Sequence, residues 1–379
     1  MNWIKASGYL LVFLIFITSI EILSFSVIYF LQNKYHTLKF DAELITNFEA
    51  VASANYSNDL GWITPIEERD EIGARINDDI YESNCIDMFG DSFTFSTEVT
   101  SEFAWPKQLS KIIGCKVNNF GVGGYGSDQA TLRHDLTPAF SKVAVLNHLS
   151  ENITRNVNQF RNLLYPGSSL KLKPRYIVNS DSELKLIKKP ELVDTDLKSL
   201  KSLTYKLKYE YFIPEGSSGI KWNLKFPYFL SAIDLITNHF HINSKIRGIT
   251  RHSDFYTRTH PSNALVLTNK IFERFVSNSV TKGQTPIITI IPTCRDLEEF
   301  KRYGSLPYQE MIEDLKAKDV LFYDFSSAFL AKDDFTKYFN LCSAHPNKEG
   351  YALMAKNFAM FLSRNKNSLA TYIPTLIEK

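Results

Sequence analysis

The sequence predicts an α/β protein, a three-layer α/β/α fold around a central parallel sheet, preceded by an N-terminal transmembrane helix. Between residues 85 and 160, short apolar runs typical of buried strands alternate with amphipathic runs typical of helices, and the same rhythm resumes after residue 285. Strands separated by helices indicate βαβ units, whose parallel sheet is covered on both faces. Near the N-terminus, a single apolar stretch is too long for an ordinary strand or core helix.

The apolar stretch runs from Gly8 to Leu31, which is long enough to cross ~30 Å of hydrocarbon at about 1.5 Å per residue. Glu21 in its middle costs about 2.5–3.5 kcal/mol, but the Leu, Ile, Phe and Val residues each return about 0.3–0.6 kcal/mol, so insertion remains favourable. A cleaved signal peptide is the alternative. Its apolar core would be only about 7–15 residues, and the nearest small-residue site, Ala52-Ser53-Ala54, lies far downstream. We therefore expect an uncleaved, single-pass anchor.

The charges that flank this span leave its orientation open. Lys5 on one side stands against Lys34 and Lys39 on the other, and acidic residues contribute little to orientation. The short N-terminal flank and the chemistry described below favour a catalytic domain in the periplasm or outside the cell.

Four cysteines allow three full pairings. Cys85 and Cys115 begin two strands expected to be neighbours, Cys294 follows an apolar run, and Cys342 lies just before His345. In an oxidising compartment the preferred pairs are 85–115 and 294–342; in a reducing one all four would be thiols. Because no Cys-x-x-Cys pair or His cluster has the spacing of zinc ligands, we expect no metal and no cofactor.

The chain divides into an anchor at 1–40, a polar stretch at 41–80 that we interpret as a stalk packing on the main domain, and that domain at 81–370. Residues from about 161 to 280 break the α/β rhythm with Lys-rich, Tyr-rich and Pro-containing pieces and the loop Gly216-Ser217-Ser218-Gly219, and we interpret them as an insertion. The expected strands are Cys85–Phe89, Lys116–Phe120, Val143–Leu149, Pro286–Ile291 and Val320–Asp324, and the expected helices are Trp105–Ile113, Ser127–Leu136, Tyr308–Lys318 and Lys348–Leu362.

The overall charge gives no indication of a nucleic-acid partner. Lys plus Arg number 43 and Asp plus Glu 41, a formal net charge of +2. Local basic runs such as Leu170-Lys171-Leu172-Lys173 are typical of a solvated strand or helix face. The Gly-rich segment from Gly121 to Gly126 is not followed by Lys-Ser or Lys-Thr, which argues against a phosphate loop of the Walker type.

Two motifs predict the halves of a serine-esterase site. A serine hydroxyl is a poor nucleophile until a nearby base accepts its proton, so a placed serine requires a placed histidine. Ser92, in the run from Phe89 to Thr94, lies at the end of the first expected strand. His345 precedes the C-terminal helix, whose first turn Asn347 can cap.

Two further blocks follow the next two expected strands, the glycine-rich run Asn119–Gly126 and the run Leu149–Ile153. Open α/β folds bind their ligands at the carboxyl edge of the sheet, where all these strand ends meet. In this order the four blocks resemble the SGNH/GDSL hydrolase superfamily, over residues of about 85–160 and 285–362, and the resemblance implies a flavodoxin-like fold.

The resemblance also implies the role of each residue. Ser92 would be the nucleophile and His345 the general base, and an oxyanion hole would form from Ser92, the Gly124 N–H and the Asn152 side chain. Ser150 and Ile153 depart from the Gly-x-Asn-Asp pattern that the superfamily usually has around that Asn. Arg155, just beyond this block, suits either an acidic or sugar substrate or a surface salt bridge.

The expected acid is missing from its usual place. The superfamily usually has an Asp three residues before the His, and this chain has Cys342 there. A thiol cannot hold an imidazolium as a carboxylate does, so we expect a Ser92–His345 dyad, orientation of the ring by another group such as a backbone carbonyl, or a site that has lost activity. Asp324, Asp333 and Asp334 lie nearby in sequence, but the sequence does not place them against the imidazole.

The resemblance and the anchor together imply a membrane-anchored serine esterase that removes O-acyl groups, acetyl above all, from a cell-envelope carbohydrate. Its partners would then be the membrane, through the N-terminal helix, and an acylated small molecule or polysaccharide. An O-acyltransferase that uses the same serine is the first alternative, because only the acceptor differs from water. A non-catalytic glycan-binding envelope protein is the second, and Cys342 is its main support.

Overall fold

The computed structural model describes residues 2–35, 38, 45, 55–77, 81, 83–213 and 226–365. The chain forms two compact units. One unit comprises Met1–Phe48, Phe160–Lys171 and Pro190–Arg251, and the other, which contains the large sheet, comprises Glu49–Gln159, Leu172–Lys189 and His252–Lys379. The segment Ala52–Ala54 and the loop Gly216–Gly219 discussed above lie outside the described residues.

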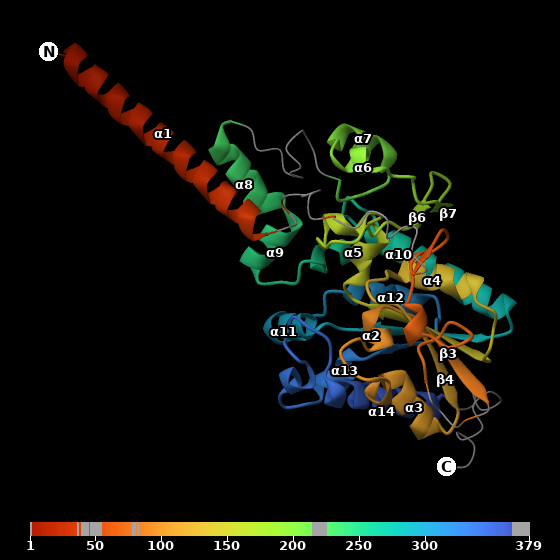
Figure 1. Cartoon of the computed structure of the whole chain (residues 1–379). Helices are drawn as coiled ribbons and strands as arrows, with labels where there is room; N and C mark the ends of the chain where they lie inside the picture. Colours follow the sequence, from red (N-terminus) through yellow and green to blue (C-terminus); the bar gives the residue numbers. More distant parts are fainter. Residues whose placement is uncertain are drawn as a thin grey trace. The chain divides into compact units, whose positions relative to one another are not determined.

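Within the described residues, the second unit is built on a five-stranded parallel sheet with the order β4-β3-β5-β8-β9 (Figure 1). If the five strands are numbered in chain order, their order in the sheet is 2-1-3-4-5, the flavodoxin-like arrangement. Its topological switch point, where successive strands begin to be added on the other side of the first strand, lies between β3 and β5. All five strands fall where the sequence predicts them. Their bounds are β3 Asn84–Gly90, β4 Lys116–Gly121, β5 Val143–Leu149, β8 Thr285–Ile291 and β9 Phe322–Asp324.

Helices cover both faces of this sheet, as predicted (Figure 1). On one face α3 (Trp105–Ile113) packs against α14 (Lys348–Arg364), and on the other α4 (Ser127–Leu136) packs against α10 (Ala264–Thr281). α12 (Gln309–Ala317) lies beside α10. The core under α3 and α14 includes fully buried rings and apolar side chains from Trp105, Met88, Val145, Met354 and Phe358. The three-layer α/β/α prediction is therefore confirmed.

The remaining elements are short, apart from the N-terminal helix. They are α1 Asn2–Lys34, β1 Tyr56–Ser57, β2 Gly61–Trp62, η3 Ile66–Glu68, α2 Ser92–Phe95, η4 Ser101–Phe103, α5 Asn152–Asn156, η5 Arg161–Leu163, β6 Arg175–Val178, β7 Leu184–Ile187, α6 Asp194–Leu197, α7 Leu200–Lys206, α8 Tyr228–Asn238, α9 Phe240–Arg247, η6 Ser253–Tyr256, α11 Cys294–Tyr303, α13 Ser326–Leu330 and η7 Phe335–Tyr338.

The segment interpreted as an insertion, 161–280, does not behave as one block. The β6–β7 hairpin and α10 belong to the unit that contains the sheet, whereas 160–171 and 190–251 belong to the other unit. α10 buries Leu265, Thr268, Ile271 and Phe275 at intervals of three and four residues, the spacing of one helix face. The periodic signal was therefore present in the sequence, but it lay inside a stretch that its Lys- and Pro-rich neighbours made look irregular.

The first unit contains α1, whose segment Ala6–Lys34 is long and apolar enough to cross a membrane. α1 packs against α8, and Ile28, Leu38, Leu235 and Ile242 form a small apolar cluster with α9. Of the stretch at 41–80 interpreted as a stalk that packs on the main domain, residues 55–77 belong to the sheet unit and pack on it. The backbone N–H of Arg75, for example, donates to Asn119 O at 2.8 Å.

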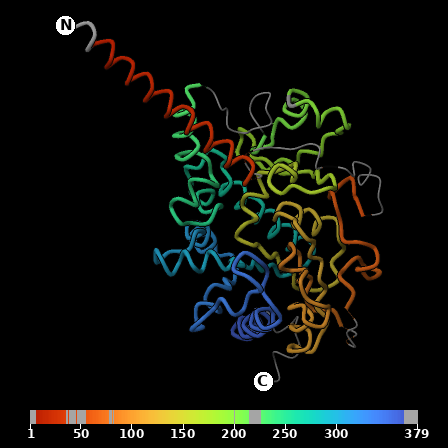
Figure 2. The backbone as a smooth tube through the Cα atoms, turned by 60° about the vertical axis from the view of Figure 1, so that its left-hand side comes forward, coloured from red at the N-terminus to blue at the C-terminus, as the bar shows by residue number. Residues whose placement is uncertain are grey.

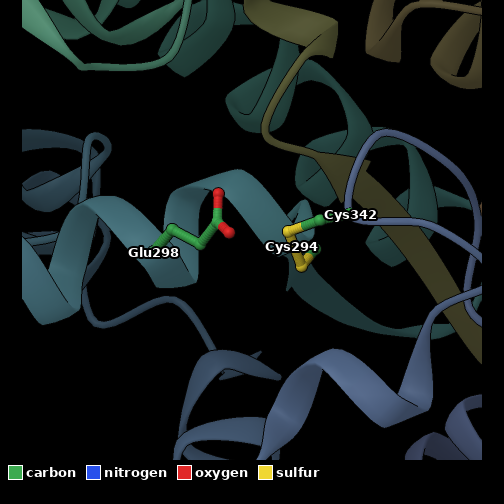
Figure 3. A group of neighbouring side chains, drawn as sticks. All are labelled: Cys294, Glu298 and Cys342. Atoms are coloured by element: carbon green, nitrogen blue, oxygen red, sulfur yellow. A yellow bond between two sulfur atoms is a disulfide. The ribbon is translucent and has the colours of Figure 1, made fainter.

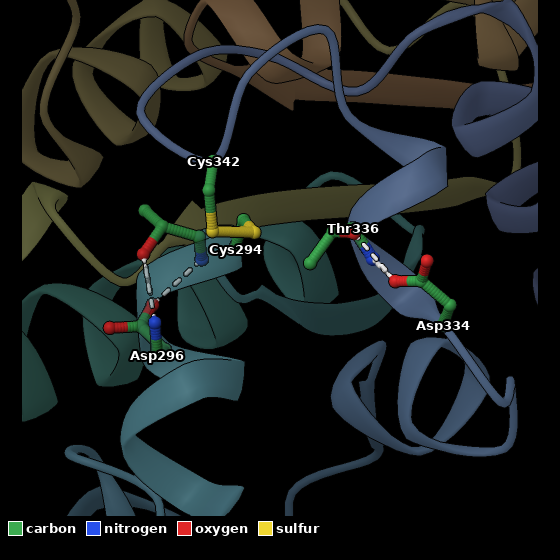
Figure 4. Close-up of a disulfide and its surroundings, with 6 residues drawn as sticks. Cys294, Asp296, Asp334, Thr336 and Cys342 are labelled. Carbon is green, nitrogen blue, oxygen red and sulfur yellow. Dashed lines mark hydrogen bonds between the residues drawn. A yellow bond between two sulfur atoms is a disulfide. The ribbon is translucent and has the colours of Figure 1, made fainter.

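Both preferred disulfides are formed. Cys85–Cys115 links β3 to the segment that leads into β4, and Cys294–Cys342 links the first turn of α11 to the loop that carries His345 (Figure 4). The second bond gives Cys342 a structural reason to occupy the position where the superfamily has its acid.

Candidate active site

Ser92 is the first residue of α2, directly after β3, and it lies at the carboxyl edge of the sheet. The Asp91 carboxylate accepts a hydrogen bond from the backbone N–H of Phe93 at 2.9 Å and so caps α2. This turn packs tightly on the end of β4, because a Cβ atom at Gly121 would lie 2.4 Å from the backbone N of Phe95. A glycine at position 121 therefore allows the close approach that fixes the height of Ser92 above the sheet.

His345 meets Ser92, as the sequence predicts. The His345 Nε2 atom lies 2.8 Å from Ser92 Oγ, within hydrogen-bond distance. The loop before the histidine is held by the Cys294–Cys342 disulfide, and after it Asn347 caps α14 by accepting from the Gly350 N–H at 3.0 Å. Anchors on both sides of the residue thus limit the movement of the imidazole relative to the serine.

Glu98 supplies the carboxylate that the sequence left unplaced. Its Oε1 atom lies 2.8 Å from His345 Nδ1, on the side of the ring opposite Ser92, and its Oε2 atom accepts a hydrogen bond from the Asn340 side chain. Serine, histidine and glutamate therefore form one hydrogen-bonded chain. The arrangement replaces both the dyad and the backbone-carbonyl expectation, because a carboxylate contacts the ring.

The aspartates considered as candidates have other partners. Asp324 accepts hydrogen bonds from the Tyr308 hydroxyl and from Ser326, and Asp334 accepts from the backbone N–H and hydroxyl of Thr336 (Figure 4). No contact of Asp333 with the imidazole is found among the described residues.

Arg75 holds the loop on which Glu98 lies. Its guanidinium donates to the carbonyl oxygen of Phe95, to that of Ser96 at 3.0 Å and to that of Val99 at 2.8 Å. Partial burial of Glu98 raises the pKa of its carboxyl, but the hydrogen bonds from His345 and Asn340 outweigh burial and the net shift is downward. The carboxylate is therefore charged when it faces the imidazole at neutral pH.

Gly124, the predicted backbone donor, lies in a peptide whose direction is fixed by its neighbours. Gly124 has φ = 82°, a left-handed conformation that glycine adopts without strain. The indole N–H of Trp62 donates to the Gly123 carbonyl oxygen at 2.9 Å. This carbonyl and the Gly124 N–H belong to the same trans peptide and point in opposite directions, so Trp62 fixes the direction of the Gly124 donor. The Tyr125 hydroxyl in turn donates to Trp62 O at 2.8 Å.

Asn152 is the first residue of α5, immediately beyond β5, and it is fully buried. Neither its side-chain nitrogen nor its side-chain oxygen has a hydrogen-bond partner among the residues that the structure describes. Buried polar atoms are nearly always paired, and exceptions concentrate where a ligand or a reacting group is bound. The unpaired amide supports the predicted role of Asn152 as an oxyanion donor.

Arg155 contacts all three of the sequence blocks that follow β3, β4 and β5. Its guanidinium donates to the Asp91 carboxylate at 2.9 Å, to the Tyr125 carbonyl at 2.9 Å and to the Glu151 carboxylate at 3.1 Å. Only 5% of Arg155 is exposed. Burial raises the pKa of Asp91, and the positive charge of Arg155 opposes that rise. Arg155 is therefore a buried clamp, which differs from both a substrate contact and a surface salt bridge.

Arg155→Met should lower the free energy of unfolding by about 3–5 kcal/mol, because it leaves the buried Asp91 carboxylate without its counter-ion. Chemical unfolding of the full-length protein in detergent measures this change. Arg258→Met is the matched control, since Arg258 pairs with Asp314 at the surface and exposed pairs contribute only about 0–1 kcal/mol. Equal losses in the two variants would contradict the clamp.

One group of side chains resembles a metal site in its geometry. Cys294, Glu298 and Cys342 bring their ligand atoms to within 4.8 Å of one another (Figure 3). The two sulfurs are joined in a disulfide and therefore provide no thiolate, which is the form of cysteine that binds metals.

Comparisons with known proteins give only distant likenesses. No family model matches the chain, and no curated protein matches its sequence. Two solved structures are of proteins described as lipolytic and of the G-D-S-L family. The one from Desulfitobacterium hafniense is 13% identical with a TM-score of 0.33, over 74% of this chain and 99% of that one. The one from Veillonella parvula is 14% identical with a TM-score of 0.37, over 74% of this chain and 100% of that one.

A third similar structure is an acetyl xylan esterase from the rumen bacterium Butyrivibrio proteoclasticus, 10% identical with a TM-score of 0.32, over 78% of this chain and 68% of that one. At these identities and TM-scores the likenesses carry no argument about activity. The functional case rests on the sheet order and on the geometry of the site.

Of the predicted site residues, the structure brings Ser92 and His345 into contact, and the oxyanion roles of Gly124 and Asn152 stay predictions. No sequence pattern indicated the contacts of Glu98, Arg75 and Trp62. The signal for Glu98 was indirect. Cys342 occupies the usual position of the acid, which left room for a carboxylate from elsewhere, and Glu98 lies only six residues after the predicted nucleophile.

Proposed function

We propose that this protein is a membrane-anchored serine esterase of the SGNH/GDSL type with the triad Ser92, His345 and Glu98. The observation that carries the proposal is the continuous hydrogen-bonded chain from Ser92 Oγ to His345 Nε2 and from His345 Nδ1 to Glu98, each at 2.8 Å. This is the geometry that activates a serine for attack on a carbonyl carbon.

The reaction follows from the positions of these groups. As Ser92 Oγ attacks the ester carbonyl, His345 Nε2 accepts its proton, and Glu98 holds the proton on Nδ1 and stabilises the imidazolium. The Ser92 N–H, the Gly124 N–H and the Asn152 amide donate to the oxyanion of the tetrahedral intermediate. His345 then returns the proton to the leaving alkoxide, and water releases the acyl group from Ser92 by the same steps.

For the substrate, we propose an O-acyl group, acetyl above all, on a cell-envelope carbohydrate. Two features support this assignment. α1 suits a membrane anchor, and two disulfides in the sheet unit suit an oxidising compartment, which supports a site in the periplasm or outside the cell. Glu98 removes the main support for a non-catalytic protein, because that alternative depended on the missing acid.

The test uses the full-length protein in detergent with p-nitrophenyl acetate and a fluorophosphonate. We expect turnover and covalent labelling, with the label on the peptide that contains Ser92 by mass spectrometry. Neither turnover nor labelling would contradict a serine enzyme. Labelling with transfer of acetyl to an added oligosaccharide, in place of release to water, would identify the O-acyltransferase alternative.

Trp62→Phe should lower kcat about fivefold and leave KM nearly unchanged, because it removes a hydrogen bond worth about 1 kcal/mol that orients and polarises the Gly124 peptide. The ring remains to pack on Tyr125. Tyr56→Phe is the matched control, since it removes a hydrogen bond of the same hairpin, to Leu172 O at 2.7 Å, without touching the oxyanion peptide. A fall in Tm without a fall in kcat for Trp62→Phe would show that Trp62 is only structural.

A further inference from the structure

α8 carries two apolar faces, and only one of them is covered. Ser231 and Leu235 are buried toward α1. On the opposite side, Phe226, Leu230 and Ile233 are exposed by 73%, 53% and 53%. Leu230 and Ile233, three positions apart, form one stripe along the helix, and Phe226 lies two residues before the helix begins at Tyr228. A water-exposed stripe of this kind is unusual for a helix that has already found a packing partner.

Glu21 fixes the depth of α8 along α1. Its carboxylate accepts a hydrogen bond from the backbone N–H of Tyr228, at the N-terminus of α8, and only 8% of the residue is exposed. Its apolar neighbours on α1, such as Phe16 and Leu23, are exposed by 60% and 65%. A carboxylate within a membrane span requires a partner, and the positive end of a helix dipole provides one. The start of α8 therefore lies level with the middle of the apolar span.

From that level, both helices run toward the C-terminal end of α1 (Figures 1 and 2). The rings of Phe25 and Tyr228 lie 5.1 Å apart near the start of α8. At the far end the Tyr35 ring lies 5.2 Å from that of His241 and 4.7 Å from the ammonium group of Lys245. Tyrosine and basic side chains of this kind mark the boundary between hydrocarbon and water.

The length of α8 matches the hydrocarbon thickness of one leaflet of a bilayer. α8 has 11 residues, a length of about 16 Å at 1.5 Å per residue. This is close to half of the ~30 Å hydrocarbon thickness. The exposed polar residues of α8, Asp234, Thr237 and Asn238, all lie in its second half, toward the end that adjoins α9, and the Asp234 carboxylate accepts a hydrogen bond from the Asn238 side chain at 2.6 Å.

We propose that α8 is immersed beside α1 in the leaflet that adjoins the C-terminal end of α1, with Phe226, Leu230 and Ile233 against the lipid acyl chains. The occupant of the exposed stripe is thus the bilayer, because the stripe continues the exposed apolar surface of α1. The protein would be held by one spanning helix and one half-depth helix. This proposal is independent of the proposed esterase activity.

The test is the accessibility of a nitroxide spin label in the full-length protein in phospholipid nanodiscs. The four native cysteines are in disulfides, so a label attaches to an introduced cysteine alone. Leu230→Cys and Ile233→Cys are the test variants. Phe16→Cys on α1 is the lipid reference, and Met360→Cys, an exposed position on α14 of the sheet unit, is the aqueous reference. We expect the labels at 230 and 233 to collide more with oxygen than with a water-soluble nickel complex, as at 16, and the reverse at 360.

Other outcomes overturn the proposal. If the labels at positions 230 and 233 were as accessible to the nickel complex as the label at 360, while the label at 16 stayed in lipid, α8 would lie in water. Nickel accessibility at position 16 as well would overturn the anchor on which the proposal depends. The labels at 230 and 233 could also collide rarely with both reagents and show dipolar broadening that disappears when unlabelled protein is added. That result would show that a second copy of the protein covers the stripe.

Discussion

Ser92→Ala should lower kcat for p-nitrophenyl acetate by about 10⁶-fold, because the oxyanion donors and substrate contacts alone retain only a small part of the catalysis of a serine triad. Reaction with the fluorophosphonate should be lost completely. The change removes one hydroxyl from a residue that is 8% exposed and whose hydroxyl contacts His345, so the fold should be unaffected. The measurements are the turnover rate and gel fluorescence of the labelled protein.

Ser327→Ala is the matched control for this experiment. Ser327 is an exposed serine whose hydroxyl donates to the Asp324 carbonyl at 3.1 Å, away from the site. It should label and turn over like the unaltered protein. Labelling that persists in Ser92→Ala would assign the nucleophile to another residue and overturn the proposed triad.

Glu98→Gln should lower kcat by about 10⁴-fold, the size of effect seen when the acid of such a triad becomes an amide. The structure gives the reason. Asn340 donates to Oε2 of Glu98, so the oxygen of the new amide will face Asn340 and its NH₂ group will face His345 Nδ1. An NH₂ donor at Nδ1 favours the tautomer that is protonated on Nε2, which cannot accept the proton of Ser92.

The pH dependence of this variant follows from the pKa of Glu98. Because that pKa is lowered, the carboxylate is charged across about pH 5–8, where an imidazole titrates, and the loss should persist throughout that range. Because the pKa of Glu98 is lower in the folded than in the unfolded protein, its charged form stabilises the fold. This stabilisation is present above the unfolded pKa of about 4.3 and disappears as the pH falls through the folded pKa.

Two carboxylates serve as controls for Glu98→Gln. Glu102 lies in η4 and pairs with Lys111 at 3.5 Å at the surface, and Asp334 caps η7. Glu102→Gln and Asp334→Asn should keep full activity. If Asp334→Asn lost activity and Glu98→Gln kept it, the acid would lie near the histidine in sequence, as it usually does in the superfamily.

The candidate site residues that lie at strand ends could all be named from the sequence. Ser92, Gly124 and Asn152 each follow one of three strands that neighbour one another in the sheet, and parallel strands bring their carboxyl ends to one edge whatever the loops do. Periodicity therefore indicated that the three strand ends share one edge, and the resemblance to the SGNH/GDSL superfamily pointed to the residue at each of them.

Glu98 could not be predicted in this way. It lies in an irregular loop after α2, and the path of that loop depends on the guanidinium of Arg75, which comes from a segment before the first sheet strand. Asn340, which orients the carboxylate, comes from the other end of the chain. No periodic pattern encodes such contacts, and the boundary of the insertion was missed for a related reason, since α10 joins the sheet unit through tertiary packing.

The position of Glu98 changes how the site is assembled along the chain. Ser92 and Glu98 are six residues apart, so the nucleophile and the acid arise from one local turn, and only His345, 253 residues beyond Ser92, must be brought from a distance. The Cys294–Cys342 bond ties that distant residue to the sheet unit covalently. The central sheet strands between residues 99 and 293 must therefore fold before His345 can meet Ser92, whereas Ser92 and Glu98 are already neighbours in the chain.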